Sequence, residues 1–460
     1  MSSPKKIFGT DGVRGTANIE PVTAETALKL GRAAGHVFKN LATQPRGRGR
    51  HKIVLGKDTR LSGYMLESAI SSGILSMGVD VLFIGPLPTP GVAYVTRSLR
   101  ADAGIVITAS HNAYDDNGIK FFRADGYKLD DKIEFEIESL VFSGRIENIR
   151  PTADEVGKAV RIEDALGRYI EYAKASFPRG MTLEGMRIVV DCAHGASYKS
   201  TPCILRELGA DVITYGNQPD GKNINKDCGS MHPGLLCQKI WEHRADLGIG
   251  HDGDADRVLM SDENGKLIDG DDILAIAALD LLEQGALREK TVVATVMSNA
   301  GLEAAMQQAG GQMLRTPVGD KNVIDEMLRN GFNLGGEQSG HIIFRDFSTT
   351  GDGIVAALQI LRIMKAKGAP LSRLAKCWTR FPQLVTNIQV REKRPFEELD
   401  TVLQLLAEAE QELKGHGGRV LLRYSGTEPK ARLLLEGRES AVLEKWSAKI
   451  SEAVKRQVGV

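Results

Sequence analysis

The sequence predicts an α/β protein of several domains, in which βαβ units build mixed, largely parallel sheets and a small α+β domain ends the chain. Three observations support this prediction. The length of 460 residues suggests about three domains at roughly 150 residues each. Apolar runs that suit buried strands alternate with amphipathic stretches, which is typical of βαβ units. From about Leu371 the pattern changes to strand, helix, two strands and a final helix.

The elements of the α/β part are expected from short apolar runs and from apolar residues at helical spacing. Strands are expected at Ile53–Leu55, Val79–Ile84, Gly104–Thr108, Arg187–Val190, Val212–Tyr215, Leu247–Gly250 and Val292–Val296. Helices are expected among them at Ala24–Leu41, Leu61–Met77 and Ile273–Leu282. The last part is expected to hold strands at Leu384–Val390, Arg419–Arg423 and Ala431–Leu435, with helices at Pro395–Leu413 and at the end of the chain.

A weak internal repeat indicates that one unit recurs in the α/β part. Gly78–Gly85 resembles Gly209–Gly216, since each follows a helical pattern and ends at a glycine turn, and Gly310–Gly319 is a poorer copy. The order helix, glycine, strand is common in any α/β protein, so this similarity alone does not establish a repeat. Linkers are expected near Gly144–Pro151, Arg257–Asp269 and Ala366–Pro370.

Composition excludes several classes of function. Lys plus Arg and Asp plus Glu both number 59, so no net field steers nucleic acid or an anionic membrane toward the protein. The basic run Arg46–Lys52 is interpreted as a solvated loop, because a nucleic-acid patch would carry interleaved aromatic residues. Five cysteines without a CxxC spacing argue against a disulfide framework or structural zinc. The N-terminus has no apolar segment typical of a secretory signal, so a cytoplasmic protein is expected.

Three aspartates follow the strand that is expected to end near Gly250. Asp252, Asp254 and Asp256 are two residues apart, so they can converge only in a turn, which Gly253 permits. Converging carboxylates repel one another unless a cation neutralises them, and their oxygens suit Mg²⁺ or Ca²⁺. The sequence favours a Mg²⁺ site at the carboxyl end of a strand, where open α/β sheets bind ligands.

Two alternatives to a magnesium site stay open. One is a solvated acidic turn without an ion. The other is an EF-hand loop, because Glu263 falls at its twelfth position. Arg257 stands where that loop needs glycine, however, and a strand precedes it in place of a helix.

A serine follows another expected strand, Gly104–Ile107. Ser110 would project into the same kind of crevice at the end of a sheet. It lacks the GxSxG surroundings of a hydrolase nucleophile, and a single serine in a loop is usually a turn residue. Ser110 alone is therefore weak evidence for catalysis.

Two further segments offer groups that suit a sugar phosphate. Gly335–His341 displays a carboxylate, an amide, a hydroxyl and an imidazole, while Arg423–Pro429 with Arg432 offers hydroxyls, guanidiniums and backbone N–H groups for a phosphate. Either segment can also be a solvent-facing turn. A near P-loop at Gly216–Asn223 ends without Ser or Thr and contains Pro219, so it is not expected to bind phosphate.

Together with Phe8–Gly15 (FGTDGVRG), these segments resemble the α-D-phosphohexomutase superfamily, in its order from Phe8 to about Gly437. One such motif is weak evidence, but five in order are specific. Within the superfamily, FGTDGVRG, Gln338 and Thr295–Asn299 resemble phosphoglucosamine mutases more than phosphomannomutases or phosphoglucomutases.

The resemblance implies three related α/β domains and a fourth α+β domain around a central cleft, with boundaries expected at 1–150, 151–257, 258–370 and 371–460. It implies that Ser110 is phosphorylated and binds one Mg²⁺ per subunit together with Asp252, Asp254 and Asp256. The residues implied around the reacting phosphoryl group are Arg14, His111, Lys120 and Arg257. Those implied to contact the sugar are Glu337, Ser339 and His341, and those implied to hold the other phosphate are Arg423, Ser425, Gly426, Thr427 and Arg432.

The implied reaction interconverts glucosamine 6-phosphate and glucosamine 1-phosphate, which supplies UDP-N-acetylglucosamine and cell-wall synthesis. Phosphorylated Ser110 would donate its phosphoryl group to form a sugar 1,6-bisphosphate, also the activator, and would receive the other phosphoryl group back. Lys120 or His341 could act as general acid or base. The implied partner is a small sugar phosphate, with no nucleic acid and no membrane, and the resemblance suggests a homodimer.

Two residues depart from the superfamily pattern. Ala113 stands where proline usually follows SHN, which makes the loop less rigid, and Tyr424 replaces the proline or lysine often found before SGTEP. Neither change removes a chemical group. A phosphomannomutase or phosphoglucomutase is the alternative enzyme. A sugar-phosphate-binding protein with a degenerate site is the alternative outside enzymes, although the intact Ser110, aspartates and Lys120 argue against it.

Overall fold

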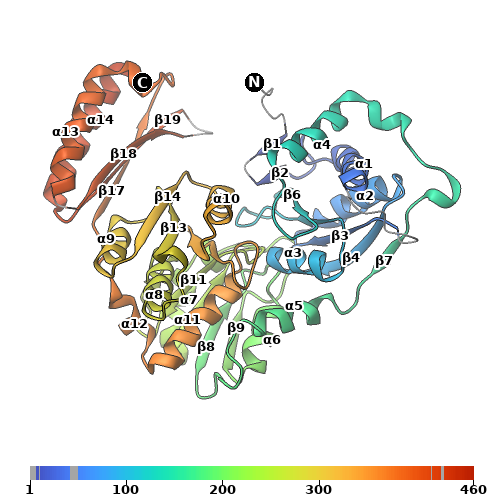
Figure 1. The fold of residues 1–460 in the computed structure, drawn as a ribbon, viewed down its shortest axis with the longest axis horizontal. Coiled ribbons are helices and arrows are strands. Elements are labelled where there is room, and N and C mark those ends of the chain that lie inside the picture. The colour runs from blue at the N-terminus through green and yellow to red at the C-terminus, as the bar shows by residue number, and fades with distance from the viewer. Residues whose placement is uncertain (1–6, 10, 42–49, 416, 426–428, 460) are drawn as a thin grey trace. The chain divides into compact units, whose positions relative to one another are not determined.

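The computed structural model describes residues 7–9, 11–41, 50–415, 417–425 and 429–459. The chain forms two compact units, drawn in Figure 1. Unit 1 comprises Met1–Val296 and Arg315–Ala375, and unit 2 comprises Met297–Leu314 and Lys376–Val460. Residues 46–49 of the basic run lie outside the described residues.

One strand order occurs three times along the chain. The four strands lie in the orders β6-β5-β3-β4, β11-β10-β8-β9 and β16-β15-β13-β14. In each copy a helix follows the first strand and another follows the second, so the third strand lies beside the first. A fourth strand then pairs antiparallel with the third through a short connection. The internal repeat suggested by the glycine pattern is therefore present in the fold.

The first copy forms the centre of a seven-stranded sheet, β1-β2-β6-β5-β3-β4-β7. β3 pairs parallel with β4 and β5, and β5 pairs antiparallel with β6. Its strands are β1 (Phe8–Gly9), β2 (Gly12–Thr16), β3 (Lys52–Lys57), β4 (Asp80–Pro86), β5 (Ala103–Ile107), β6 (Asp116–Arg123) and β7 (Ala159–Arg161). Its helices are α1 (Ala24–Leu41), α2 (Gly63–Leu75), α3 (Thr89–Ser98) and α4 (Asp131–Ser143).

The second copy lies in a five-stranded sheet, where β8 pairs parallel with β9 and β10. Its elements are α5 (Ala165–Lys174), β8 (Arg187–Asp191), α6 (Ser200–Glu207), β9 (Asp211–Tyr215), α7 (Gly234–His243), β10 (Leu247–His251), β11 (Val258–Asp262) and β12 (Leu267–Ile268). The linker predicted at Arg257–Asp269 is wrong, because β11 pairs with β10 and β12 pairs with β11 inside this sheet.

The third copy has the shortest strands. Its elements are α8 (Gly270–Glu283), β13 (Thr291–Thr295), α9 (Ala300–Gln308), β14 (Gln312–Thr316), α10 (Asp320–Asn330), β15 (Leu334–Gly336), β16 (Ile342–Phe344) and α11 (Gly353–Lys367). β13 and β15 are parallel, and β16 is antiparallel to β15. The mixed sheets of the three copies agree with the predicted α/β class.

Burial explains why these segments form central strands. All residues of β5, β10 and β13 are buried, as expected for strands covered on both faces. α1 and α2 approach closely through glycines, because a Cβ at Gly31 would lie 2.2 Å from the Ile70 carbonyl oxygen and one at Gly73 would lie 2.2 Å from that of Leu28. This close contact packs the two helices directly against each other.

Unit 2 contains the predicted C-terminal α+β fold. Its antiparallel sheet has the order β17-β19-β18, with strands at Gln383–Gln389, Lys430–Glu436 and Arg419–Tyr424. Helices α13 (Asp400–Gly415) and α14 (Ser440–Val458) lie along one side of this sheet (Figure 1). Leu433, Leu435 and Ile388 are buried with apolar residues of these helices. The short α12 (Leu371–Leu374) precedes the unit.

Candidate active site

Three of the segments singled out in the sequence occupy equivalent places in the three copies of the fold. Residues 108–115 join β5 to β6, residues 252–257 join β10 to β11, and residues 337–341 join β15 to β16. Each connection follows the third strand of its copy and leads into the antiparallel fourth strand. We call these connections the serine loop, the aspartate loop and the glutamate–histidine loop. All three lie in unit 1.

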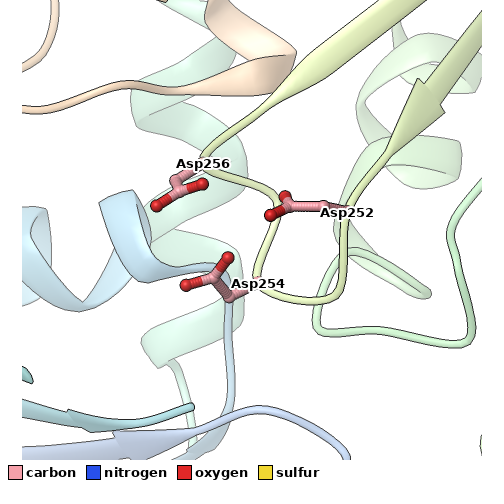
Figure 2. Close-up of side chains that lie close together, drawn as sticks. All are labelled: Asp252, Asp254 and Asp256. Carbon is pink, nitrogen blue, oxygen red and sulfur yellow. The ribbon is translucent and has the colours of Figure 1, made fainter. Parts of the chain in front are cut away.

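The carboxylates of Asp252, Asp254 and Asp256 converge, as the sequence predicts. Carboxylate oxygens of all three lie within 4.8 Å of one another, and Figure 2 shows them gathered around one point of the aspartate loop. Ala255 has a left-handed backbone with φ of +55°, which turns the loop back on itself. All three aspartates are buried, so a solvated acidic turn is wrong for this segment.

The groups around the three aspartates pair with some of their carboxylate oxygens and leave others available to a cation. The Nζ of Lys120 lies 2.9 Å from Asp254 Oδ2 and 3.4 Å from Asp256 Oδ2, and Thr89 Oγ1 donates a 2.7 Å hydrogen bond to Asp254 Oδ2. The buried Oδ1 atoms of Asp254 and Asp256 accept no hydrogen bond from the described residues. Buried carboxylate oxygens without donors are the ligands that a hard divalent cation takes. The residues present therefore fit a metal ion.

The three aspartates differ in their ease of ionisation. Burial and the neighbouring charges of Asp256 and Asp254 raise the pKa of Asp252 well above its ordinary value. Burial alone would also raise the pKa of Asp256, but Lys120 and His341 hold it well below its usual range. Lys120 and His341 thus favour the charged form of Asp256, whereas on the side of Asp252 burial and the two carboxylate neighbours oppose the charged form.

The hydroxyl of Ser110 lies on that side of the triad. Its Oγ donates a 2.6 Å hydrogen bond to Asp252 Oδ2, and Ser110 is 2% exposed. The residue has φ of +51°, a left-handed conformation that costs a non-glycine residue about 1–2 kcal/mol. Its backbone N–H donates to Thr108 Oγ1 at 2.9 Å. The serine loop is therefore held in a strained shape that aims the hydroxyl at the aspartates.

Cationic and imidazole side chains surround Ser110. His111 Nδ1 lies 3.5 Å from Ser110 Oγ. Burial and the nearby cations of Arg257 and Arg14 lower the pKa of His111 to about 4, so its imidazole is neutral at physiological pH. Burial alone would lower the pKa of Arg257, but the carboxylates of Asp256 and Asp252 raise it. The structure thus brings Arg14, His111 and Arg257 to the serine and aspartate loops.

The glutamate–histidine loop reaches the same aspartates. His341 Nδ1 lies 3.7 Å from Asp256 Oδ1. Burial alone would lower the pKa of His341, but Asp256 and Asp320 raise it. Glu337 Oε1 accepts a 3.0 Å hydrogen bond from the Gly319 N–H, and Ser339 Oγ donates to Glu337 Oε2 at 3.5 Å. A carboxylate, a hydroxyl and an imidazole are therefore presented together.

The fourth segment lies in unit 2. Arg423 and Arg432 face each other on neighbouring strands β18 and β19, and they line a cavity of about 230 Å³ on the sheet. Burial and the charge of Arg432 lower the pKa of Arg423. The backbone N–H of Ser425 donates to the Lys430 carbonyl at 2.8 Å. Gly426 and Thr427 lie outside the described residues.

Four family models match most of the chain. Those of phosphoglucomutase/phosphomannomutase α/β/α domains I, II and III match residues 5–147, 167–265 and 269–381. The model of the C-terminal domain matches residues 385–453. The chain belongs to the phosphoglucomutase/phosphomannomutase family. This family membership makes it a phosphohexomutase, an isomerase that transfers phosphate within a sugar phosphate.

Relatives and solved structures agree with this family. The chain is 54% identical over 455 residues to the phosphoglucosamine mutase of Citrifermentans bemidjiense, covering 99% of each protein. It is 55% identical over 456 residues to that of Myxococcus xanthus, covering 99% of this chain and 98% of the relative. The fold is similar to a phosphoglucomutase/phosphomannomutase family protein from Burkholderia thailandensis, with a TM-score of 0.80, 24% identity and 99% of both chains covered. It is also similar to Aspergillus fumigatus N-acetylphosphoglucosamine mutase, solved with GlcNAc-6P and magnesium, with a TM-score of 0.65, 17% identity and 98% and 96% of the chains covered.

Three charged residues of this phosphohexomutase complete a closed ring that sequence reasoning did not find. Lys120 Nζ lies 2.9 Å from Asp11 Oδ2, Asp11 Oδ1 lies 2.5 Å from Lys128 Nζ, and Lys128 pairs with Asp320. Asp320 Oδ2 lies 3.5 Å from His341 Nε2, and His341 closes the ring through Asp256 to Lys120.

The ring joins the first, second and third copies of the fold, with the carboxylates of Asp11, Asp320 and Asp256 alternating with Lys128, His341 and Lys120. Asp11 carries a signal that sequence analysis could have used, because it lies inside the FGTDGVRG motif. Asp320 begins α10 directly after Gly319, and Lys128 follows β6, so neither shows a pattern of its own.

Among the described residues, no helix has the length and apolar character needed to cross a membrane.

Proposed function

We propose that this phosphohexomutase interconverts glucosamine 6-phosphate and glucosamine 1-phosphate, with Ser110 as the phosphoryl carrier. The observation that carries the proposal is the 2.6 Å contact between Ser110 Oγ and Asp252, one of three converging carboxylates. A buried hydroxyl beside a cation site is the arrangement that a phosphoenzyme needs. The choice of sugar is supported by relatives named phosphoglucosamine mutase that are 54–55% identical along nearly the whole chain.

Asp252, Asp254 and Asp256 would hold one Mg²⁺ per subunit together with the phosphorylated Ser110. Bound there, the ion would neutralise charge on the phosphoryl group during transfer. The orphaned carboxylate oxygens of Asp254 and Asp256 support this assignment. Arg14, Lys120 and Arg257 would add positive charge, and Lys120 suits this role because its carboxylate neighbours, against the effect of burial, raise its pKa well above 10.5.

Phosphoryl transfer would then proceed in two balanced steps. In the first, the O–P bond of phosphorylated Ser110 breaks and an O–P bond to the free sugar hydroxyl forms, while that hydroxyl gives up its proton and the Ser110 oxygen takes one. The bisphosphorylated sugar turns, and the other phosphoryl group returns to Ser110. We assign the proton transfers to Lys120 or His341, which lie beside the aspartate loop, Lys120 Nζ 2.9 Å from Asp254 Oδ2 and His341 Nδ1 3.7 Å from Asp256 Oδ1.

The remaining residues would position the sugar phosphate. Glu337, Ser339 and His341 would bind sugar hydroxyls and the amine, and Arg423, Ser425 and Arg432, with Gly426 and Thr427, would hold the phosphate that is not reacting. A trace of sugar 1,6-bisphosphate would keep Ser110 phosphorylated. The domain boundaries near residues 150 and 370, a homodimer and a cytoplasmic location stay predictions. The boundary near residue 257 conflicts with β11 and β12, which lie in the sheet of the second copy.

The decisive variant is Ser110→Ala. We expect it to lose mutase turnover by more than about 10³-fold, as for loss of a catalytic nucleophile, and to lose the phosphate seen in the intact mass. Ser143→Ala, an exposed serine at the end of α4, is the matched control and should keep wild-type turnover. Near-wild-type turnover of Ser110→Ala would refute the phosphoserine mechanism.

Sugar specificity requires a separate comparison. The 6-phosphates of glucosamine, glucose and mannose would be compared by kcat/KM with Mg²⁺ and a trace of the matching bisphosphate. We expect the highest value for glucosamine 6-phosphate. A higher value for mannose or glucose phosphate would assign the chain to the alternative mutases.

A further inference from the structure

The backbone carbonyls of the serine loop are gathered by two side chains that come from outside the loop. Arg60 follows β3, and Asn225 lies between β9 and α7 in the second copy of the fold. Each donates 2.9 Å hydrogen bonds to the carbonyl oxygens of both Ser110 and Asn112. Arg60 also donates to the Ala113 carbonyl. We call this arrangement the carbonyl clamp.

The Arg60 side of the clamp is fully buried. Arg60 is 1% exposed, and its Nε donates to Asp58 Oδ2 at 2.9 Å. The same guanidinium therefore uses one nitrogen for a buried ion pair and the other two for the serine loop. A planar guanidinium presents these donors in a rigid fork, so the spacing of the loop carbonyls is set by a rigid group.

The Asn225 side of the clamp is anchored in the second copy of the fold. Asn225 has φ of +58°, a left-handed conformation that asparagine tolerates better than most residues. Its backbone N–H donates to the Ala193 carbonyl at 2.9 Å. The aspartate loop packs against the same place, since a Cβ at Gly253 would lie 2.6 Å from the Ser110 oxygen and 2.8 Å from Asn225 Nδ2.

We propose that Asn225 and Arg60 are positioning residues that hold Ser110 at the in-line position for phosphoryl transfer. The inference rests on the proposed role of Ser110 as phosphoryl carrier. Ser110 occupies a strained left-handed conformation, and the loop contains Ala113 where a proline would have restricted the backbone. The clamp supplies that restriction from outside, because turning the Ser110 peptide would break bonds to two donors at once.

If phosphorylated Ser110 is displaced from its in-line position, it should transfer its phosphoryl group slowly while the substrate still binds normally. Within the serine loop the clamp contacts only backbone carbonyls, and it contacts none of the groups assigned to the sugar or to its second phosphate. Displacement of a reacting group by about 1 Å can lower a rate by about 100-fold. Loss of the clamp should therefore lower kcat and leave KM nearly unchanged, which is the pattern of an interaction that matters in the transition state.

The test compares Asn225→Gly and Asn225→Asp with the control Asp227→Gly in the full-length protein. Glycine accepts the left-handed backbone at position 225 and removes the donor together with the rest of the side chain, whereas aspartate keeps the shape and turns an oxygen toward two carbonyl oxygens. Asp227 has φ of +55° in the same segment and is exposed, so Asp227→Gly makes the same backbone change without removing a hydrogen bond to the serine loop.

Three quantities would be measured with phosphorylated enzyme, Mg²⁺ and glucosamine 6-phosphate. The first two are kcat and KM. The third is the single-turnover rate constant for loss of phosphate from Ser110, which reports the transfer step per folded, phosphorylated molecule and does not change when a fraction of the protein is unfolded. The affinity for Mg²⁺, measured by calorimetry, checks that the aspartate loop is intact.

We expect Asn225→Gly to lower kcat and the single-turnover rate constant by about 10- to 100-fold, with KM changed by less than about 3-fold. Asn225→Asp should be slower still, and Asp227→Gly should match the wild type. Equal single-turnover rate constants for Asn225→Gly and Asp227→Gly would overturn the inference, even if Asn225→Gly is less stable. Full activity of Ser110→Ala would instead refute the phosphoserine mechanism itself, whatever the Asn225 variants show.

Discussion

The serine loop and the aspartate loop occupy the same place in two copies of one fold, yet they are held in different ways. The aspartate loop is held by close backbone packing, since the Gly253 carbonyl accepts a 2.8 Å hydrogen bond from the Ala196 N–H and a Cβ at Gly195 would lie 2.3 Å from that oxygen. The serine loop is held by side chains of Arg60 and Asn225 that reach it from elsewhere.

This difference follows from what each loop has to do. Three carboxylates need a rigid, closely spaced turn, because a cation site depends on the distances among its ligands. A hydroxyl that carries phosphate has to point in one direction, and a few hydrogen-bond donors to the carbonyl of the same residue can fix that direction. The repeated fold thus supplies equivalent loop positions, and the local sequence gives each loop its own chemistry.

The largest effect that would break this comparison is expected from Asp252→Asn. The variant keeps the shape of the side chain and removes one charge from the triad, so both cation binding and the partner of Ser110 are weakened. We expect kcat/KM to fall by about 10³-fold and Mg²⁺ affinity to fall with it, measured by coupled assay and calorimetry. Asp246→Asn, an exposed aspartate before β10, should change neither. Unchanged Mg²⁺ affinity of Asp252→Asn would exclude Asp252 as a ligand.

A smaller effect than that of Asp252→Asn is expected from Gly253→Ala, which tests whether the aspartate loop depends on close packing. In Gly253→Ala the new methyl group would lie 2.6 Å from the Ser110 carbonyl oxygen, so one of the two loops must move. We expect kcat to fall by about 10- to 100-fold and the free energy of unfolding to fall by about 1–3 kcal/mol. Urea denaturation and steady-state kinetics would measure both.

Ala113→Gly makes the reverse change in the serine loop and is the matched variant. Its carbonyl still accepts from Arg60, so we expect a loss of only a few-fold in kcat. If Ala113→Gly lowers kcat as much as Gly253→Ala does, close packing is equally important in the two loops and the proposed difference between them is wrong.

The smallest effect concerns the ring of charges that joins the three copies. Lys128→Met removes the ammonium between Asp11 and Asp320 and leaves two carboxylates without their shared cation. We expect the free energy of unfolding to fall by about 1–2 kcal/mol and kcat to fall only slightly, because Lys120 keeps its contacts with Asp254 and Asp256. Lys132→Met, at an exposed position in α4, is the control, and an equal loss of stability there would show that the ring adds nothing.

Much of the fold follows from local patterns in the sequence. The helix predicted at Ala24–Leu41 has those bounds in the structure, and the predicted central strands coincide with β3, β4, β5, β8, β9, β10 and β13 to within a few residues. The linker predicted at Arg257–Asp269 is wrong because β11 and β12 are short and follow an acidic turn, so their strand character depends on pairing, of β11 with β10 and of β12 with β11. The family resemblance, the α/β class and the enzyme class are confirmed.

The candidate site could be predicted where chemistry is concentrated in one motif, and not where it depends on contacts between distant segments. The convergence of Asp252, Asp254 and Asp256 could be inferred from spacing alone. Arg60 carried a weak signal, since a charged Asp-Thr-Arg sequence follows a buried strand. Asn225 follows the near P-loop at Gly216–Asn223, which is not expected to bind phosphate, and the role of Asn225 depends on tertiary contacts with the serine loop.

The chain enters unit 2 twice, and this limits how the protein can be truncated. Asn299 exchanges 2.9 Å hydrogen bonds with the backbone of Phe381, and Arg419 donates to the Ser298 carbonyl at 2.9 Å. A fragment that begins after residue 375 would lack the earlier segment of unit 2, residues 297–314, to which these groups are hydrogen-bonded. An isolated C-terminal fragment must therefore also carry residues 297–314. Without them, Arg419 and the backbone of Phe381 would lose these hydrogen-bond partners.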